Sequence, residues 1–180
     1  LHDIFRKETA GHVAVVRDFI ARCRESVAPY AVTEALHRAA HTLSGIAKTA
    51  GVRQGIKVAE PMEHYVRKLH DSGHGLPEEG LLLLRDTVYS LENVVEHVDE
   101  DTGYFPDHGR LIAGWHALER SLDAAPRLVL SLTSRARIAA ERNDSATAIA
   151  MLRRLQDAST RVAVPIAELE RAWGRGGAAG

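Results

Sequence analysis

The segment Thr33–Gly51, with the sequence TEALHRAAHTLSGIAKTAG, decides how the rest of the chain can be arranged. At about 100° per residue its side chains separate into the two faces of an amphipathic helix. Thr33 can cap the amino terminus of this helix, and Gly51 can end it in a left-handed conformation. The apolar face comprises Val32, Leu36, Ala39, Leu43, Ile46, Ala47 and Ala50. The polar face, which is centred on His41, comprises Glu34, His37, Arg38, His41, Ser44, Gly45 and Lys48. The segment therefore predicts a helix that presents an imidazole at the middle of its solvent-facing side.

Gly45 lies one turn after His41 on this polar face. A glycine inside a helix costs about 1 kcal/mol relative to alanine. We expect this glycine to clear the surface beside the imidazole so that another protein can approach it. The residues His41-Thr42-Leu43-Ser44-Gly45, followed by Ala47 and Gly51, resemble the H-x-L-K-G-x-A-x-x-x-G signature of histidine phosphotransfer (Hpt) domains. The chain departs from this signature at Ser44, where the family usually has lysine.

The composition excludes several classes of protein. The 180 residues are 45% hydrophobic and 5% aromatic, a balance that suits helices packing through aliphatic stripes. The formal net charge of −1 does not indicate the excess of positive charge that is typical of nucleic-acid-binding proteins. No apolar run approaches the roughly 20 residues that span a bilayer, no secretory signal is visible, and Cys23 has no second cysteine to pair with. We expect a cytoplasmic chain, cut from a longer protein because it begins at Leu1 and ends in GRGGAAG.

Four amphipathic helices are predicted in residues 1–103, the region over which the Hpt resemblance extends. The predicted ranges are about Leu1–Val27, Thr33–Gly51, Val52–Asp71 and Pro77–Asp101. Pro61 should kink the third helix or break it beforehand, because an internal proline costs about 3 kcal/mol. Short connections between long helices favour an all-α, antiparallel up-and-down four-helix bundle.

The residues after 103 are also predicted to be helical. Pro106 and Pro126 indicate helices at about 106–122 and 126–142, and Asn143 or Asp144 can cap another that reaches about Trp173. A stripe of Leu111, Trp115, Leu118 and Leu122 is expected to dock on the bundle. The predicted organisation is a four-helix bundle at 1–103, a helical extension packed on it at 104–174, and a flexible tail at 175–180.

The polar face around His41 can support phosphoryl chemistry. A histidine can act as a nucleophile toward phosphorus, and its near-neutral pKa leaves a ring nitrogen lone pair available. Attack is favoured if the other nitrogen donates to a fixed acceptor, and Glu63, at the margin of the third apolar stripe, could reach across. The Hpt resemblance implies the same role for Glu63, because chemotaxis-type kinases have a glutamate at this offset. The alternative is that Glu63 has no special role and is an ordinary carboxylate between the buried and the exposed side of its helix.

The resemblance also implies a docking surface for a receiver domain over His37, His41, Ser44, Gly45 and Lys48. Arg38 and Lys48 flank His41 and could stabilise the phosphoryl group. The alternative for both is a solubilising residue on an exposed face, and for Arg38 the two interpretations have equal weight. Ser44 offers a hydroxyl where the family has a lysine. An exposed ionic contact is usually worth about 0–1 kcal/mol, so this loss should weaken transfer without abolishing it.

The chain has no G-x-x-x-x-G-K-[ST] loop and no acidic cluster in a strand-loop setting. We therefore expect no cofactor in this chain: ATP and Mg²⁺ should come with the ATP-binding domain of a histidine kinase and with a response-regulator receiver domain. The motifs AHTLSGIAKTAGV and AEPMEHY look most similar to modules of the chemotaxis-like kinases that regulate type IV pili.

Two other functions remain open at the level of sequence. The first is a degenerate docking or scaffold module with the same fold, which Ser44 and Pro61 favour. The second is a metal-binding bundle, prompted by ten histidines. Carboxylate di-metal bundles need Glu-x-x-His on two facing helices, and only the Glu34–His37 pair fits. Because that pair is predicted to face solvent, and His64, His70 and His74 share no tight face, no metal site is expected.

Overall fold

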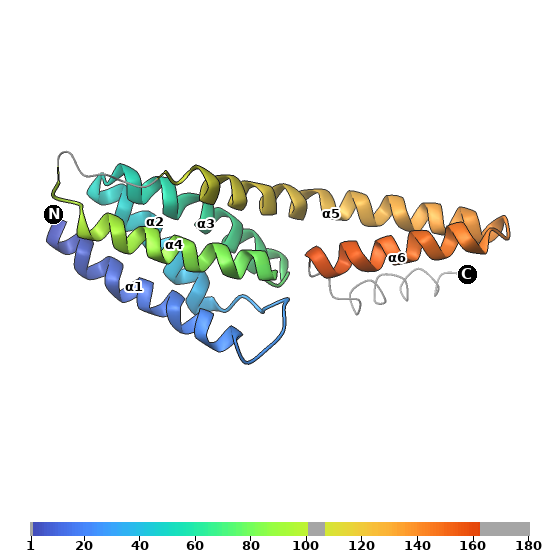
Figure 1. Ribbon diagram of the computed structural model, residues 1–180, viewed down its shortest axis with the longest axis horizontal. Coiled ribbons are helices and arrows are strands. Elements are labelled where there is room, and N and C mark those ends of the chain that lie inside the picture. The colour runs from blue at the N-terminus through green and yellow to red at the C-terminus, as the bar shows by residue number, and fades with distance from the viewer. Residues whose placement is uncertain (1, 101–106, 163–180) are drawn as a thin grey trace. The chain divides into compact units, whose positions relative to one another are not determined.

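The computed structural model describes residues 2–100 and 107–162, apart from the side chains of 126–131, 134 and 158–162. These residues form α1 (His2–Cys23), α2 (Glu34–Ala50), α3 (Arg53–Ser72), α4 (Glu78–Glu96), α5 (Gly109–Glu141) and α6 (Ser145–Val162), as Figure 1 shows. The described residues form no strand beyond an isolated bridge between Tyr30 and Leu76. The predicted all-α class is therefore confirmed.

Two compact units divide the chain, at Leu1–Glu119 and Arg120–Gly180. The first unit holds α1 to α4 and the first part of α5, and the second holds the rest of α5 together with α6. The division falls inside a helix, so it differs from the predicted boundary at residue 103.

The first unit is a four-helix bundle in which consecutive helices run in alternating directions (Figure 1). α1 packs against α2 and α4, and α3 packs against the same two helices. Every helix therefore buries its apolar stripe between two neighbours. The side chains that are at most 1% exposed in this core include Phe5, Val16, Leu36, Val58, Met62, Leu69, Leu84 and Leu91. Cys23 lies in the same core at 5% exposed, as predicted.

The two ends of α2 are fixed by the residues that the sequence indicates. The Thr33 side-chain oxygen accepts a hydrogen bond from the Leu36 N–H at 3.2 Å. Gly51 has φ of 68°, the left-handed region that glycine adopts without a steric penalty, and its N–H donates to the carbonyl of Lys48. These caps fix where α2 begins and ends, and they therefore also fix the position of His41 within the helix.

Some predicted helix ends are wrong by several residues. α1 ends at Cys23 rather than Val27, and Val27 is 86% exposed. After Cys23 the backbone N–H groups of Arg24, Glu25 and Ser26 donate to the carbonyls three residues earlier, so the chain leaves the α-helix through tighter turns. α4 ends at Glu96 rather than Asp101, and Val94 in its last turn is fully buried.

The two internal prolines do not divide their helices. α3 continues through Pro61, so of the two predicted outcomes, a kink or a break, the break does not occur. Ala59 and Met62 on either side of this proline are both fully buried, and their packing offsets the lost backbone hydrogen bond. α5 continues through Pro126, so one helix replaces the two predicted at 106–122 and 126–142.

The first part of α5 belongs to the bundle through Trp115, which is 1% exposed. Its indole N–H donates to the Thr87 hydroxyl of α4 at 3.0 Å, and its ring lies 5.6 Å from that of Tyr65 on α3. Lys68 and Glu119 add an ion pair of 2.7 Å. The predicted docking stripe is thus confirmed for Trp115, whereas Leu122 falls in the second unit.

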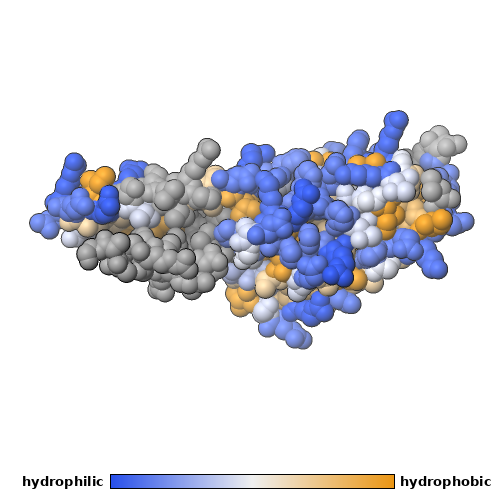
Figure 2. Space-filling model, turned by 180° about the vertical axis from the view of Figure 1, so that it is seen from behind, coloured by the Kyte–Doolittle hydropathy of each residue, from blue (hydrophilic) through white to orange (hydrophobic). Residues whose placement is uncertain are grey.

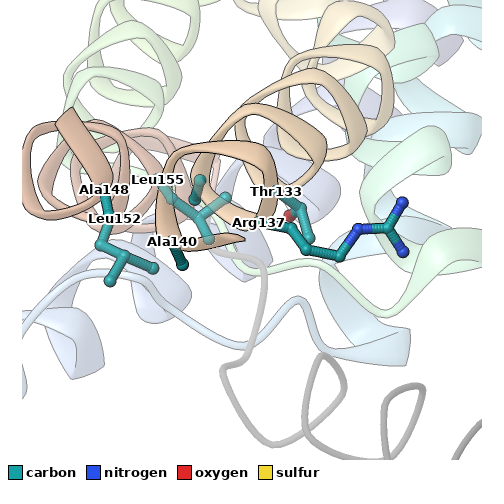
Figure 3. Close-up of a pocket in the computed structure, with 7 residues that line it drawn as sticks. Thr133, Arg137, Ala140, Ala148, Leu152 and Leu155 are labelled. Atoms are coloured by element: carbon teal, nitrogen blue, oxygen red, sulfur yellow. The ribbon is translucent and has the colours of Figure 1, made fainter. Parts of the chain in front are cut away.

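The second unit has its own small apolar cluster of Leu132, Ala136 and Met151, with Leu155 packed against it. Asp144 caps α6 by accepting a hydrogen bond from the Thr147 N–H at 3.0 Å. Beside this cluster lies an apolar groove of about 530 Å³ between α5 and α6 (Figure 3). The predicted end of the last helix near Trp173 lies outside the described residues.

On the face shown in Figure 2, hydrophilic residues are interspersed with small apolar patches, as is usual for a solvated surface. Within the described ranges, no helix combines the length and the apolar character that crossing a membrane requires.

Candidate functional site

His41 lies near the middle of α2 and points outward, with 72% of its side chain exposed. The neighbouring residues of α2 that face the other helices, Ala40 and Leu43, are almost completely buried. The imidazole therefore stands on the surface of a rigid helix rather than on a loop.

Glu63 reaches the imidazole from α3. Its Oε1 lies 3.4 Å from His41 Nδ1, and its side chain is only 6% exposed. An ionised carboxylate can only accept hydrogen bonds, so this contact requires the proton of the neutral imidazole to be on Nδ1. That tautomer leaves the lone pair on Nε2. At 3.4 Å the contact is longer than a normal hydrogen bond, as catalytic contacts often are before a partner binds.

The side chains of Arg67 and His64 also lie near the Glu63 carboxylate. Arg67 Nε is 3.7 Å from Oε1, and His64 Nε2 is 3.9 Å from Oε2. A buried carboxylate is costly unless positive charge compensates it. Arg67 supplies that charge one turn away on the same helix, so Glu63 can remain ionised beside His41.

The two cations predicted to flank His41 are on the outer face, and each has an acidic partner. Lys48 Nζ lies 2.8 Å from Glu60 Oε1 on α3, and this hydrogen bond lowers the pKa of the Glu60 carboxyl. Arg38 lies 3.2 Å from Glu34, one turn before it, and its hydrogen bond is the main cause of the lowered pKa of Glu34. Side-chain exposures of 50% for Lys48 and 74% for Arg38 leave both able to change partners.

Ser44 does not belong to the surface on which it was predicted, because it is only 3% exposed. The sequence pattern gave α2 one apolar face, but α2 packs against both α1 and α3. The buried side of α2 is therefore wider than its stripe of apolar residues, and it includes Ser44. A side chain at this position faces the interior of the bundle, so Ser44 cannot take part in a docking surface.

His37 is on the predicted side of α2 but is half-buried. Its ring stacks on that of His70 from α3, with a centroid separation of 4.2 Å and an interplanar angle of 14°. Among the described residues its Nδ1 is buried without a hydrogen-bond partner. His70 is a neighbour that the pattern did not find, because helical periodicity within one helix does not show which residues of another helix face it.

Gly45 borders a groove beside His41. A Cβ added at Gly45 would have no heavy atom within 4 Å, so the surface there is open. The groove has a volume of about 390 Å³ and is lined by Ile4, Phe5, Glu8, His41, Thr42, Gly45, Ile46, Thr49 and Ala50. Ile4 is 64% exposed. The contribution of α1 was missed at the sequence level, although Ile4, an apolar residue outside the α1 core stripe, was a usable signal.

Comparison with known proteins agrees with this arrangement. The sequence model of the Hpt domain family matches residues 1–101, which include α1 to α4, His41 and Glu63. Neither the search of curated proteins nor the search of solved structures finds a match. Since the matched region is more than half of the chain, this protein is a member of the Hpt domain family, whose function is phosphotransfer in two-component signalling.

Proposed function

We propose that His41 is the phosphoacceptor of this Hpt domain, and that it takes a phosphoryl group from a kinase domain and passes it to the aspartate of a response-regulator receiver domain. The observation that carries the proposal is the pairing of an exposed imidazole with a buried glutamate at its Nδ1. No other histidine of the described residues combines such exposure with contact to a carboxylate this deeply buried.

The transfer step follows from the tautomer. Nε2 of His41 attacks the γ-phosphorus of ATP held by the kinase domain, a P–N bond forms, and the P–O bond to ADP breaks so that ADP leaves. The same attack on the aspartyl phosphate of a receiver forms the P–N bond and releases the aspartate as a carboxylate. The proton stays on Nδ1, so the phosphorylated ring is cationic. Glu63, at 3.4 Å, compensates this developing charge. Return of the phosphoryl group to a receiver reverses the same steps.

ATP and Mg²⁺ belong to the partner domains in this proposal, because the chain has no phosphate-binding loop of the G-x-x-x-x-G-K-[ST] type. The kinase domain would supply the phosphoryl group, and the receiver would supply the acceptor aspartate with its metal. The similarity of the motif around His41 to chemotaxis-like kinases of type IV pili supports a larger kinase of that kind as the parent protein.

The groove beside His41 is the surface on which the partner would dock. Ile4 and Ile46 offer apolar contacts, and Gly45 allows close approach at the level of the imidazole. His41 lines the same groove, so a partner bound there would lie close to the imidazole. Lys48 can be released from Glu60 to contact the phosphoryl group, since half of its side chain is exposed.

The experiment is phosphoryl transfer from a cognate kinase or a phosphorylated receiver to the purified chain. The wild type should take up acid-labile, base-stable phosphate, and His41→Gln should take up none. His116→Gln is the matched control, because His116 is also an exposed helical histidine, and its labelling should equal that of the wild type. Label persisting on His41→Gln at the wild-type level would overturn the assignment.

A non-phosphorylated docking module is the second candidate function. It is favoured by two observations near His41. Ser44 is buried and carries no charge where the family usually has lysine, and Lys48 is paired with Glu60. Receiver binding without any phosphate uptake by the wild type would select this alternative.

A further inference from the structure

We propose that Glu34, His37 and His70 form a binding site for a divalent transition metal of the zinc class, which joins α2 to α3 one turn before His41. The inference is independent of the phosphotransfer assignment, because it rests on a different set of contacts.

Three metal-ligating side chains from two helices converge at this point. Glu34 and His37 are one turn apart on α2, and His70 comes from α3. His70 Nε2 lies 2.9 Å from Glu34 Oε2, and His37 Nδ1 lies 3.9 Å from the same oxygen. One ligand atom from each residue falls within 4.8 Å of the other two. In the described part of the chain, this is the only group of three such side chains with that geometry.

The second observation is the unpaired nitrogen of His37. Its Nδ1 is buried and makes no hydrogen bond to any described residue. Leaving a buried polar atom without a hydrogen-bond partner is unfavourable. The atom points into the group formed with Glu34 and His70, where a metal ion would be bonded to it.

The donor set selects the class of metal. Two imidazoles and one carboxylate are a known zinc ligand set, with a fourth position left for water or another ligand. Imidazole nitrogen favours zinc, copper or nickel, whereas magnesium and calcium prefer oxygen ligands only.

Neighbouring residues are arranged to support these ligands. Arg38 binds the Oε1 of Glu34 at 3.2 Å and leaves Oε2 toward the histidines. The carboxylate of Asp71 lies 3.5 Å from His70 Nδ1, the nitrogen that does not face Glu34. A carboxylate on the far nitrogen of a ligating histidine fixes its orientation and raises its basicity.

To bind an ion together, the two histidines must leave their stacked arrangement, because a metal lies close to the plane of each imidazole that holds it. Zinc–ligand distances of about 2.0–2.2 Å require the donor atoms to come closer together than they are now. Glu34 is 58% exposed and His70 30%, so both can turn and an ion can enter from solvent. Because four residues of helix rise about 6 Å, the bound ion would place positive charge close to His41.

The test is metal binding by the full 180-residue chain, free of affinity tags. Titration with Zn²⁺, and with Co²⁺ as a spectroscopic probe, should give one equivalent bound and a higher unfolding temperature. His70→Gln and Glu34→Gln should each weaken binding by at least about 10-fold, in line with the loss of one ligand. His74→Gln is the matched control, since His74 is a histidine of the α3–α4 connection outside the group, and it should bind as the wild type does.

The proposal is overturned if the wild type binds less than one equivalent at about 100 μM Zn²⁺, or if His70→Gln and Glu34→Gln both retain wild-type affinity. Glu34 is exposed, so Glu34→Gln provides the result if His70→Gln does not fold. His41→Gln should bind Zn²⁺ normally. Failure of metal binding and failure of phosphotransfer are therefore separate outcomes.

Discussion

The two nitrogens of the His41 ring have different environments, and this difference is the basis of the proposed chemistry. Nδ1 faces the buried carboxylate of Glu63, whereas most of the ring is exposed. A neutral imidazole has one donor and one acceptor nitrogen, so an acceptor at Nδ1 leaves the lone pair at Nε2. At this scale the proposed function depends on Glu63 as a positioning residue and on Gly45 as an open surface.

Glu63→Gln should slow phosphoryl transfer to His41 by at least about 10-fold, because the amide no longer compensates the charge of the phosphorylated ring. The nitrogen chemical shifts of His41 should also show a greater share of the other tautomer, a change that a purely structural role would not produce. Glu92→Gln on α4 is the control, since Glu92 pairs with Arg17 and not with a residue of the site. Equal rates and equal tautomer populations in Glu63→Gln and the wild type would refute the positioning role.

Gly45→Arg should fold and yet block transfer. The added Cβ meets no atom within 4 Å, and replacing a helical glycine stabilises a helix by up to about 1 kcal/mol. The long side chain would then fill the groove that the partner needs. Gly11→Arg is the matched control, because Gly11 is also an exposed helical glycine with no atom near an added Cβ. Transfer at the wild-type rate in Gly45→Arg would contradict the docking surface.

At the scale of elements, the connection between α1 and α2 is held to the start of α4. Tyr30 and Leu76 exchange backbone hydrogen bonds of 2.8 and 2.7 Å. The Tyr30 hydroxyl donates to Glu78 Oε2 at 2.6 Å, next to the first turn of α4. These contacts fix the loop that leads into Thr33, and so they determine where α2 begins.

The hydrogen bond to Glu78 raises the pKa of Tyr30 to about 12. Because the folded state holds this proton more tightly than the unfolded state, its stabilising effect is complete below pH 10 and is lost as the pH rises toward 12. Ultraviolet titration should show the high pKa in the wild type and a lower one in Glu78→Gln. Tyr30→Phe should remove the corresponding absorbance change. The prediction is contradicted if Glu78→Gln leaves the Tyr30 titration unchanged.

At the scale of the whole molecule, α5 carries residues of both compact units. Its first part is anchored in the bundle by Trp115, whose indole N–H has the fully buried Thr87 hydroxyl as its partner. Unfolding of the first unit should therefore involve the start of α5 together with α1 to α4. The match to the Hpt family covers residues 1–101, so it includes Thr87 of this anchor but not Trp115.

Thr87→Val should lower the free energy of unfolding by about 1–3 kcal/mol, because it leaves the buried indole N–H without a partner. Urea unfolding followed by tryptophan fluorescence and by circular dichroism measures this change. Thr49→Val is the control at an exposed position of α2 and should alter stability by less than about 0.5 kcal/mol. An equal stability of Thr87→Val and the wild type would show that the anchor contributes nothing.

The sequence by itself determined the helical class, the capped ends of α2 and the outward position of His41, because caps and periodicity act within one helix. It also indicated that Glu63 could reach His41, since a residue at the margin of an apolar stripe lies close to the next helix. The tertiary structure alone decided that Ser44 is buried, that His37 stacks on His70 and that α1 forms one wall of the groove. Each of these depends on which neighbours a helix has and how closely they pack, and a single helix's pattern does not contain that information.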